Sequence, residues 1–297
     1  MDGRVVARTV RSKIAERVKA LNAANVRPNL VTILVGDNPA SKTYLRNKHQ
    51  ACLNASMESR NVELPADTSQ AKLIDLIHDL NEGSSVTGIL LQLPLPKGLD
   101  ETEAVSTIAP EKDVDGLHPY NLGLLTQKAA KLVPCTPSGI MVLLRYYHVG
   151  IAGKHAVVIN RSKLVGRPLS QLLLNSDATV TVCHSKTQRL QEICRQADML
   201  ITGIGRRPEF TVGSDMIKRG ATVVDVGTSS VGGKLMGDVD FDSAIKVADY
   251  VTPVPGGVGP MTITMLLYNT LLAACMQEKV DLGLDLDELE SSDPSPS

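Results

Sequence analysis

The chain has 297 residues, 43% of them hydrophobic, which is enough for two domains of ordinary size with substantial cores. Its 31 lysines and arginines nearly balance 32 acidic residues, so overall charge favours neither nucleic acid nor an anionic membrane as a partner. Only 3% of the residues are aromatic and none is tryptophan, which argues against a surface on which nucleic-acid bases stack.

The first half of the chain alternates helices and strands. Hydrophobic spacing predicts helices over residues 4–23, 38–55 and 69–80, and strands over residues 30–35, 59–64 and 86–93. This alternation is typical of a mostly parallel sheet with helices on its faces.

The helix predicted over residues 38–55 carries an unusual lysine. Tyr44 and Cys52 lie on its apolar face with three alanines, and Lys48 lies on the same face, one turn from each. One interpretation is that Lys48 extends from the edge of this face into water. The other is that it points into a cleft, where it could transfer protons beside a Tyr44 ring that stacks on a flat substrate.

Two polar features follow in the first half. Gln92 interrupts an apolar run just before a Pro-Leu-Pro turn, and ligands of open α/β sheets bind beyond the carboxyl ends of strands. The loop 112–116 carries Asp113 and Asp115, which in an extended loop would point in opposite directions. Considered alone, these features are those of an ordinary strand end and a solvated turn.

The second half repeats the alternation after a helix predicted over residues 138–147. Strands are predicted over residues 155–159, 179–182, 198–202, 221–226 and 250–251, and helices over residues 168–175, 190–196 and 261–276. This pattern predicts a doubly wound, dinucleotide-binding domain.

The turn after the first of these strands predicts the cofactor site. Gly166 is its one glycine, and Asn160 stands where a first glycine is expected; asparagine tolerates left-handed backbone better than most residues. The second strand ends in Cys-His-Ser-Lys-Thr, without the carboxylate that binds the ribose of NAD. Arg161, Ser185 and Lys186 could instead hold a 2′-phosphate, which favours NADP, although solvent-facing loop residues would give the same pattern.

The cysteines and the chain ends bear on location. Five cysteines form no CxxC pair and no zinc-ligand spacing, which favours reduced thiols in the cytoplasm. The N-terminus has no signal-peptide core, and we expect no apolar run long enough to span a bilayer. Residues 280–297 are acidic with Ser-Pro repeats and are predicted to be a disordered tail.

Four motifs in this order give the chain a close resemblance to a known family. They are Ser41-x-x-Tyr44-x-x-x-Lys48, Gln92-Leu93-Pro94-Leu95-Pro96, Pro110-x-Lys112-Asp113-Val114-Asp115-Gly116, and Pro253-Val254-Pro255-Gly256-Gly257-Val258-Gly259-Pro260-Met261-Thr262. The chain resembles the bifunctional methylenetetrahydrofolate dehydrogenase/methenyltetrahydrofolate cyclohydrolases over nearly all of its length except the tail.

The resemblance implies two α/β domains with a cleft between them that binds a reduced folate. It implies a folate-binding catalytic domain over residues 1–138 with a returning helix 261–279, and an NADP-binding domain over residues 139–260. The implied catalytic residues are Lys48, Gln92 and Asp115, and the implied substrate contacts are Tyr44, Pro255, Gly256, Gly257 and Pro260. Lys48 would transfer protons in the hydrolytic step, and Gln92 would hold it in place.

For the cofactor, the resemblance implies NADP bound on Asn160, Arg161, Ser162, Ser185 and Thr228. The family usually has glycine where this chain has Asn160, and Ile-Asn where it has Thr228-Ser229. A homodimer through the cofactor domains is also implied.

Three alternatives stay open at this point. The chain could be a dehydrogenase of a small hydroxy or amino acid, because such a site would also use a lysine and an aspartate. It could be a member of the same family with only one activity. It could also be a non-catalytic NADP-binding regulator, although such a protein would be expected to lose Lys48, Gln92 and Asp115, which are present.

Overall fold

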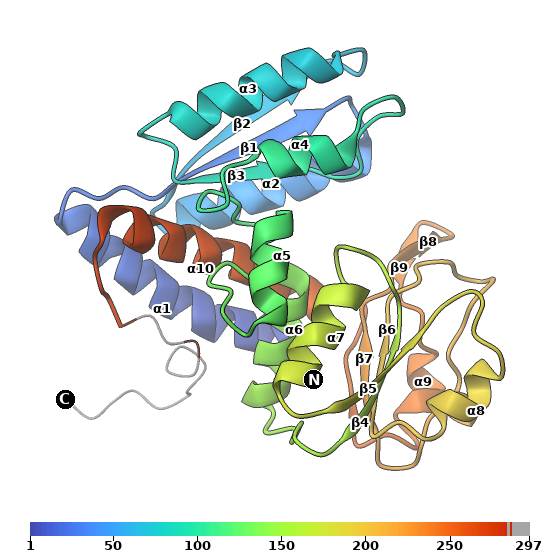
Figure 1. Ribbon diagram of the computed structural model, residues 1–297. Helices are drawn as coiled ribbons and strands as arrows, with labels where there is room; N and C mark the ends of the chain where they lie inside the picture. Colours follow the sequence, from blue (N-terminus) through green and yellow to red (C-terminus); the bar gives the residue numbers. More distant parts are fainter. Residues whose placement is uncertain (284–285, 287–297) are drawn as a thin grey trace. The chain divides into compact units, whose positions relative to one another are not determined.

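The computed structural model describes residues 1–283 and residue 286 (Figure 1). The predicted disordered tail, residues 280–297, lies mostly outside the described residues. The chain divides into two compact units, which we name by their sheets. The three-stranded unit contains Val10–Cys135 and the C-terminal segment from Ile263, and the five-stranded unit contains Met1–Thr9 and Thr136–Thr262.

The three-stranded unit has a parallel sheet in the order β2-β1-β3. Its strands are β1 (Asn29–Val35), β2 (Glu58–Leu64) and β3 (Gly88–Leu91), and its helices include α2 (Pro39–Asn54), α3 (Gln70–Glu82), α4 (Glu101–Thr107) and α5 (Pro119–Thr126). Apolar residues of α3 and α4 pack against one face of the sheet, while α2 contacts β1 and β2. The parallel sheet expected from the alternating pattern is present.

Two long helices have residues in both units: α1 (Gly3–Ala23) and α10 (Val258–Glu278). Within the described residues, α10 is long and apolar enough to cross a membrane, so the expectation of no such run was wrong. However, 72% of its apolar window is buried inside the protein. Such burial is typical of a core helix, whose apolar residues pack against protein on all sides.

The five-stranded unit is a doubly wound sheet with all strands parallel. Its order is β10-β7-β6-β4-β5, formed by β4 (His155–Ile159), β5 (Thr179–Cys183), β6 (Met199–Thr202), β7 (Thr222–Asp225) and β10 (Tyr250–Val251). Helices α6 (Cys135–Tyr146) and α7 (Gly166–Asn175) cover one face, and α8 (Leu190–Cys194) and α9 (Phe241–Ala244) cover the other. From β4 the strand order continues to β5 on one side and to β6, β7 and β10 on the other. The switch point therefore lies between β4 and β6, and ligands of such folds bind beside it.

Some elements of this unit were not predicted. A short hairpin of β8 (Ser229–Val231) and β9 (Lys234–Met236) follows β7, and a 3-10 turn spans Ser214–Met216. In their contacts, residues 1–9 group with the five-stranded unit. The amino terminus of Met1 donates to the Val251 carbonyl at 2.6 Å, and the Gly3 N–H donates to the Gly256 carbonyl at 2.9 Å.

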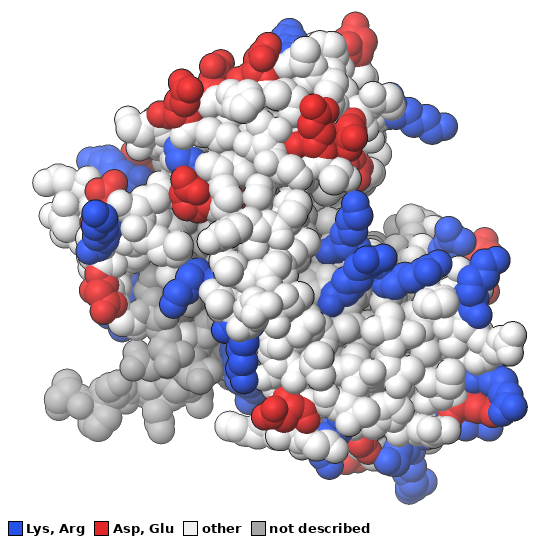
Figure 2. Space-filling view, in the orientation of Figure 1, with Lys and Arg blue, Asp and Glu red and all other residues white. Residues whose placement is uncertain are grey.

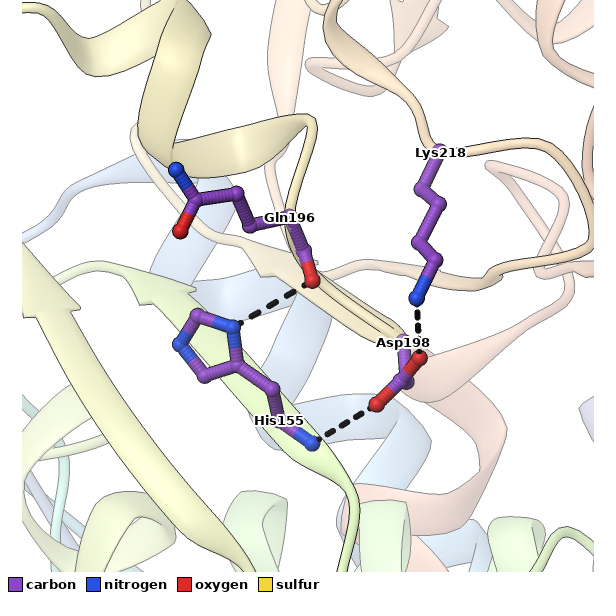
Figure 3. Close-up of polar contacts among 4 residues, drawn as sticks. All are labelled: His155, Gln196, Asp198 and Lys218. Atoms are coloured by element: carbon purple, nitrogen blue, oxygen red, sulfur yellow. Dashed lines mark hydrogen bonds and ion pairs between the residues drawn. The ribbon is translucent and has the colours of Figure 1, made fainter.

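A polar network closes the edge of this sheet where the strands begin (Figure 3). The Asp198 carboxylate accepts a hydrogen bond from the backbone N–H of His155 at 2.9 Å and pairs with Lys218 Nζ at 2.7 Å. The His155 ring contacts the Gln196 carbonyl and the Thr181 hydroxyl instead of the carboxylate. This histidine and aspartate therefore join strand ends, and their geometry is not that of a catalytic pair.

Candidate active site

Lys48 and Gln92 meet in the three-stranded unit. Lys48 lies half-buried on α2, and its Nζ donates to Gln92 Oε1 at 3.0 Å. Gln92 directly follows β3, and its backbone N–H continues the sheet by donating to the Ile33 carbonyl. Its Nε2 donates to the Leu93 carbonyl at 2.8 Å, which directs Oε1 toward the lysine. The hydrogen bond expected between these two side chains is therefore present.

Asp115 lies on a loop that is fixed from several sides. Its neighbour Asp113 is 2% exposed and accepts hydrogen bonds from the His118 N–H and from Asn121 Nδ2, whereas Asp115 is half-buried. The two carboxylates thus have different surroundings, in a loop that turns instead of extending, since the Gly116 N–H donates to the Asp113 carbonyl at 3.1 Å. Gly116 has φ +72°, and a side chain there would meet the backbone of residues 133 and 134 at 2.5 Å. Glycine is therefore required next to Asp115.

The carbonyl of Val114 also holds this loop. It accepts hydrogen bonds from the buried Asn269 Nδ2 at 2.9 Å and from Cys135 Sγ at 3.3 Å. Asn269 belongs to α10, so the C-terminal helix fixes the backbone beside Asp115.

Two buried thiols report the charges around Lys48 and Asp115. Burial raises the pKa of Cys135 well above its ordinary value; the charge of Asp115 raises it further and the charge of Lys48 opposes the rise. Burial also raises the pKa of Cys52 to about 11, against the Ser59 hydrogen bond and the charge of Lys48. Lys48 and Asp115 are therefore both close enough to Cys135 for their charges to act on its thiol.

Tyr44 lies one turn before Lys48 on α2 and is 47% exposed. A phenol ring with this exposure is free to present a face to a flat ligand. Four of the predicted site residues, Tyr44, Lys48, Gln92 and Asp115, therefore belong to the three-stranded unit.

The loop 253–257 belongs to the five-stranded unit and leads into α10, which begins at Val258. Gly256 has φ +114°, and a side chain there would come within 2.8 Å of the Arg4 guanidinium. A side chain on Gly257 would meet the Pro253 carbonyl at 2.7 Å. Both glycines are buried and Pro255 is exposed, while Pro260 occupies the first turn of α10, where its missing N–H is tolerated.

Asn160 organises the turn between β4 and α7. Its backbone is not left-handed, although asparagine tolerates that conformation, and its side chain closes the turn. Oδ1 accepts from the N–H groups of Ser162 at 2.7 Å and Gly166 at 3.1 Å, and Nδ2 donates to the Gly203 carbonyl after β6. A side chain at Gly166 would overlap the Asn160 backbone, which explains the one glycine that the turn retains.

The other predicted cofactor residues follow neighbouring strands. Arg161 and Ser162 follow β4, Ser185 follows β5 and Thr228 follows β7; all four are exposed. Since the strands are parallel and in register, their carboxyl ends meet at one edge of the sheet. Figure 2 shows lysine and arginine side chains gathered along the upper margin of this unit. The exposed basic residues that follow its strands include Arg161, Arg167, Lys186 and Arg206.

Sequence reasoning did not single out two buried carboxylates at this same edge. Asp225 ends β7 and is 3% exposed, and Asp238 follows β9 and is fully buried. Asp225 gave a signal of the kind that marked Gln92, a polar residue ending an apolar run.

Comparison with known proteins agrees with this architecture. Residues 1–115 match the family model of the tetrahydrofolate dehydrogenase/cyclohydrolase catalytic domain, and residues 134–278 match that of its NAD(P)-binding domain. The catalytic-domain model covers Tyr44, Lys48, Gln92 and Asp115, and the NAD(P)-binding model covers the predicted cofactor residues.

Individual relatives cover almost the whole chain. The bifunctional protein FolD of Nitrosopumilus maritimus is 50% identical over 280 residues, which are 94% of this chain and 98% of the relative. The bifunctional enzyme FolD of Campylobacter jejuni has a solved structure with a TM-score of 0.90 and 44% identity, covering 93% of this chain and 98% of that one. A Trypanosoma brucei dehydrogenase-cyclohydrolase, solved with NADP and an inhibitor, has a TM-score of 0.89 and 41% identity, covering 94% and 98%. The chain belongs to the tetrahydrofolate dehydrogenase/cyclohydrolase family.

Proposed function

We propose that this protein catalyses two successive steps on a reduced folate. In the first, 5,10-methylenetetrahydrofolate is oxidised to 5,10-methenyltetrahydrofolate with NADP. In the second, the methenyl product is hydrolysed to 10-formyltetrahydrofolate. The observation that carries this proposal is the match of one chain to both family domains, at 50% identity to a relative named bifunctional.

The oxidation requires orientation more than proton transfer. A hydride leaves the methylene carbon, and the lone pairs of the two flanking nitrogens stabilise the positive charge that develops there. NADP supplies the acceptor for this hydride. We assign the cofactor to Asn160, Arg161, Ser162, Ser185 and Thr228. These residues follow β4, β5 and β7 at the carboxyl edge of the sheet, next to the switch point, and this position supports the assignment.

The hydrolysis requires proton transfer. Water adds to the methenyl carbon, a ring C–N bond breaks, and protons move from the water oxygen to the departing nitrogen. We assign these transfers to Lys48, and its hydrogen bond to Gln92 supports the assignment because it fixes the position of Nζ. Gln92 is itself fixed by its bond to the Leu93 carbonyl.

We assign substrate recognition to Asp115, to Tyr44 and to residues of the segment 255–260. Asp115 would accept hydrogen bonds from the amino group and ring N–H of the pterin, a planar donor pair that suits a carboxylate. Tyr44 would stack on the flat part of the folate, for which its exposed ring is suited. We assign the remaining substrate contacts to Pro255, Gly256 and Gly257 of the loop and to Pro260 in the first turn of α10.

The preference for NADP over NAD is assigned to basic and hydroxyl side chains. Residues 184–187 after β5 contain no carboxylate, and both Arg161 and Ser185 are exposed. Arginine binds phosphate through two parallel N–H groups, which makes Arg161 the main contact for the 2′-phosphate.

The domain roles and the assembly belong to the same proposal. We assign folate chemistry to the domain over residues 1–138 with the returning helix 261–279, NADP binding to residues 139–260, and the cytoplasm as the location. We also propose a homodimer through the cofactor domains. Its support is β5, an edge strand on which Val182 is 39% exposed. The helix α7, which contacts β5, also carries an exposed Leu174.

An acid-quenched assay with methylenetetrahydrofolate tests the function. Purified protein is incubated with NADP and separately with NAD, and methenyl product is read after quenching. In a parallel sample without cofactor, the decay of added methenyl-folate measures hydrolysis. We expect turnover with NADP and accelerated decay. Turnover without accelerated decay would indicate a monofunctional dehydrogenase, and NADP binding with neither reaction would indicate a regulator.

A further inference from the structure

Asp225 and Asp238 form a buried carboxylate pair whose hydrogen-bond donors lie at the end of β6 and in the segments that follow β6, β7 and β9. Asp225 accepts from the N–H groups of Gly227 at 2.9 Å, Asp238 at 3.0 Å and Val239 at 2.8 Å. It thereby ties the loop after β7 to the segment after β9.

Asp238 makes the complementary set of contacts. Its carboxylate accepts from the Thr202 hydroxyl at 2.9 Å and from the N–H groups of Ile204 at 2.6 Å and Gly205 at 2.9 Å. These donors end β6 and begin the loop that follows it. The two carboxylates therefore fix the loops 203–205 and 226–228 relative to each other.

Three glycines leave the space that this pair and its two loops occupy. A side chain on Gly227 would come within 2.2 Å of Asp238 Cγ, and one on Gly237 would come within 2.0 Å of Asp225 Oδ2. Gly205, with φ +65°, brings the first loop against the second, because a side chain there would lie 3.0 Å from the Thr228 carbonyl. Thr228 is the residue of the second loop that we assign to the cofactor.

Placing two carboxylates together in the interior is costly, since each disfavours the charge of the other. Burial, together with the charge of Asp238, raises the pKa of Asp225 to about 6 against the hydrogen bonds that it accepts. At neutral pH the carboxylate is ionised and can accept through both oxygens. A pair of apolar residues would fill this space at lower cost but would leave six donors without acceptors.

We propose that Asp225 and Asp238 are positioning residues for NADP: they hold the loops 203–205 and 226–228 in the shape that receives the cofactor. The proposal rests on the proposed function, since it takes this edge as the NADP site. A role in stability alone would not require the donors to both carboxylates to lie together at the carboxyl ends of the strands, where NADP is assigned. Hydrolysis of methenyl-folate needs no cofactor, so it should not depend on the pair.

Asp238→Asn tests the proposal, because asparagine keeps the shape but offers one acceptor oxygen instead of two. We expect the Kd for NADP, measured by calorimetry, and the KM for NADP in the dehydrogenase assay to rise about tenfold or more. The dehydrogenase kcat should change less than KM, and hydrolysis of added methenyl-folate should stay within about twofold of the original rate.

Thr202→Val is the milder variant in case Asp238→Asn does not fold. It removes one donor to Asp238 at a fully buried position and keeps the shape of the side chain, and we expect a smaller rise in the Kd for NADP, about threefold to tenfold. Asp198→Asn is the matched control, because this carboxylate accepts a backbone N–H in the same sheet at the opposite edge. It should leave the Kd for NADP unchanged.

An unchanged Kd for NADP in folded Asp238→Asn and Thr202→Val would overturn the proposal. Equal losses of both activities in these variants would also overturn it, because they would indicate a structural role only. If the unsubstituted protein binds NADP but converts neither folate, the proposed function fails, and the calorimetric comparison still decides the role of the pair.

Discussion

Replacing Lys48 by methionine should separate the two activities. Methionine keeps most of the length of the side chain but removes the only group that we assign to proton transfer. We expect hydrolysis of methenyl-folate to fall by at least about a hundredfold, while dehydrogenase activity is partly retained because hydride transfer depends on orientation. The measurement is the rate of each step assayed separately with purified protein.

Lys42 supplies the control for this experiment. It lies on the same helix, α2, six residues before Lys48, and no role in the site is assigned to it. Lys42→Met should leave both rates near their original values. Persistence of hydrolysis at the original rate in Lys48→Met would show that another group transfers the protons.

Arg161→Ala should reduce the preference for NADP. A charge-assisted hydrogen bond to a phosphate contributes about 1.5–3 kcal/mol, so we expect NADP to bind roughly ten- to a hundredfold more weakly. NAD lacks the 2′-phosphate and should lose much less affinity. Arg219 precedes β7 at the opposite edge of the sheet, and Arg219→Ala is the control. Equal losses for NADP and NAD would remove the 2′-phosphate from the role of Arg161.

At the amino edge of the five-stranded sheet, the hydrogen bonds of Asp198 stabilise the fold, and we assign no catalytic role to them. The hydrogen bond from Lys218, followed by that from the His155 N–H, lowers the pKa of Asp198 below its ordinary value. An acid with a lower pKa in the folded state stabilises it above the ordinary pKa, near 4, and this contribution is lost as the pH falls through the lower folded value.

Asp198→Asn should therefore destabilise the protein in a pH-dependent way. We expect a loss of about 1 kcal/mol at pH 7, kept small because Lys218 is 47% exposed and its charge is screened by water. The difference between the two proteins should shrink as the pH falls toward 3. Urea denaturation at several pH values measures it, and a difference that grows on acidification would contradict the assignment.

Most regular elements could be predicted because their signals are local. The cap at Ser69 predicted α3, and the side chain does accept a hydrogen bond from the Lys72 N–H. Parallel alternation likewise predicted both sheets. The β8–β9 hairpin was missed even though Gly232-Gly233 at its turn is a usual hairpin signal, because its strands have only three residues each.

The site was predictable only in part for a related reason. Lys48 and Gln92 could be paired because each breaks a local apolar pattern and a family motif contains both. The closure of the turn by the Asn160 side chain could not be read from the sequence, because its partner Gly203 is 43 residues away. The same holds for Asp238, whose three donors come from a strand end more than thirty residues earlier.

Assembly is the remaining property that belongs to the whole molecule. The exposed edge strand β5 presents backbone groups and the apolar Val182 to solvent. Such edges are often covered by a second chain.

Val182→Lys should convert the proposed homodimer into monomers, since a charged side chain on this edge would have to lose its water on association. Sedimentation velocity at micromolar concentration measures the change, and we expect hydrolysis per chain to be retained. Ile245, which follows α9 and is 51% exposed, provides an apolar control in the same unit, and Ile245→Lys should leave the dimer intact. A dimer that persists in Val182→Lys would move the interface away from β5, and a monomeric unsubstituted protein would exclude the homodimer itself.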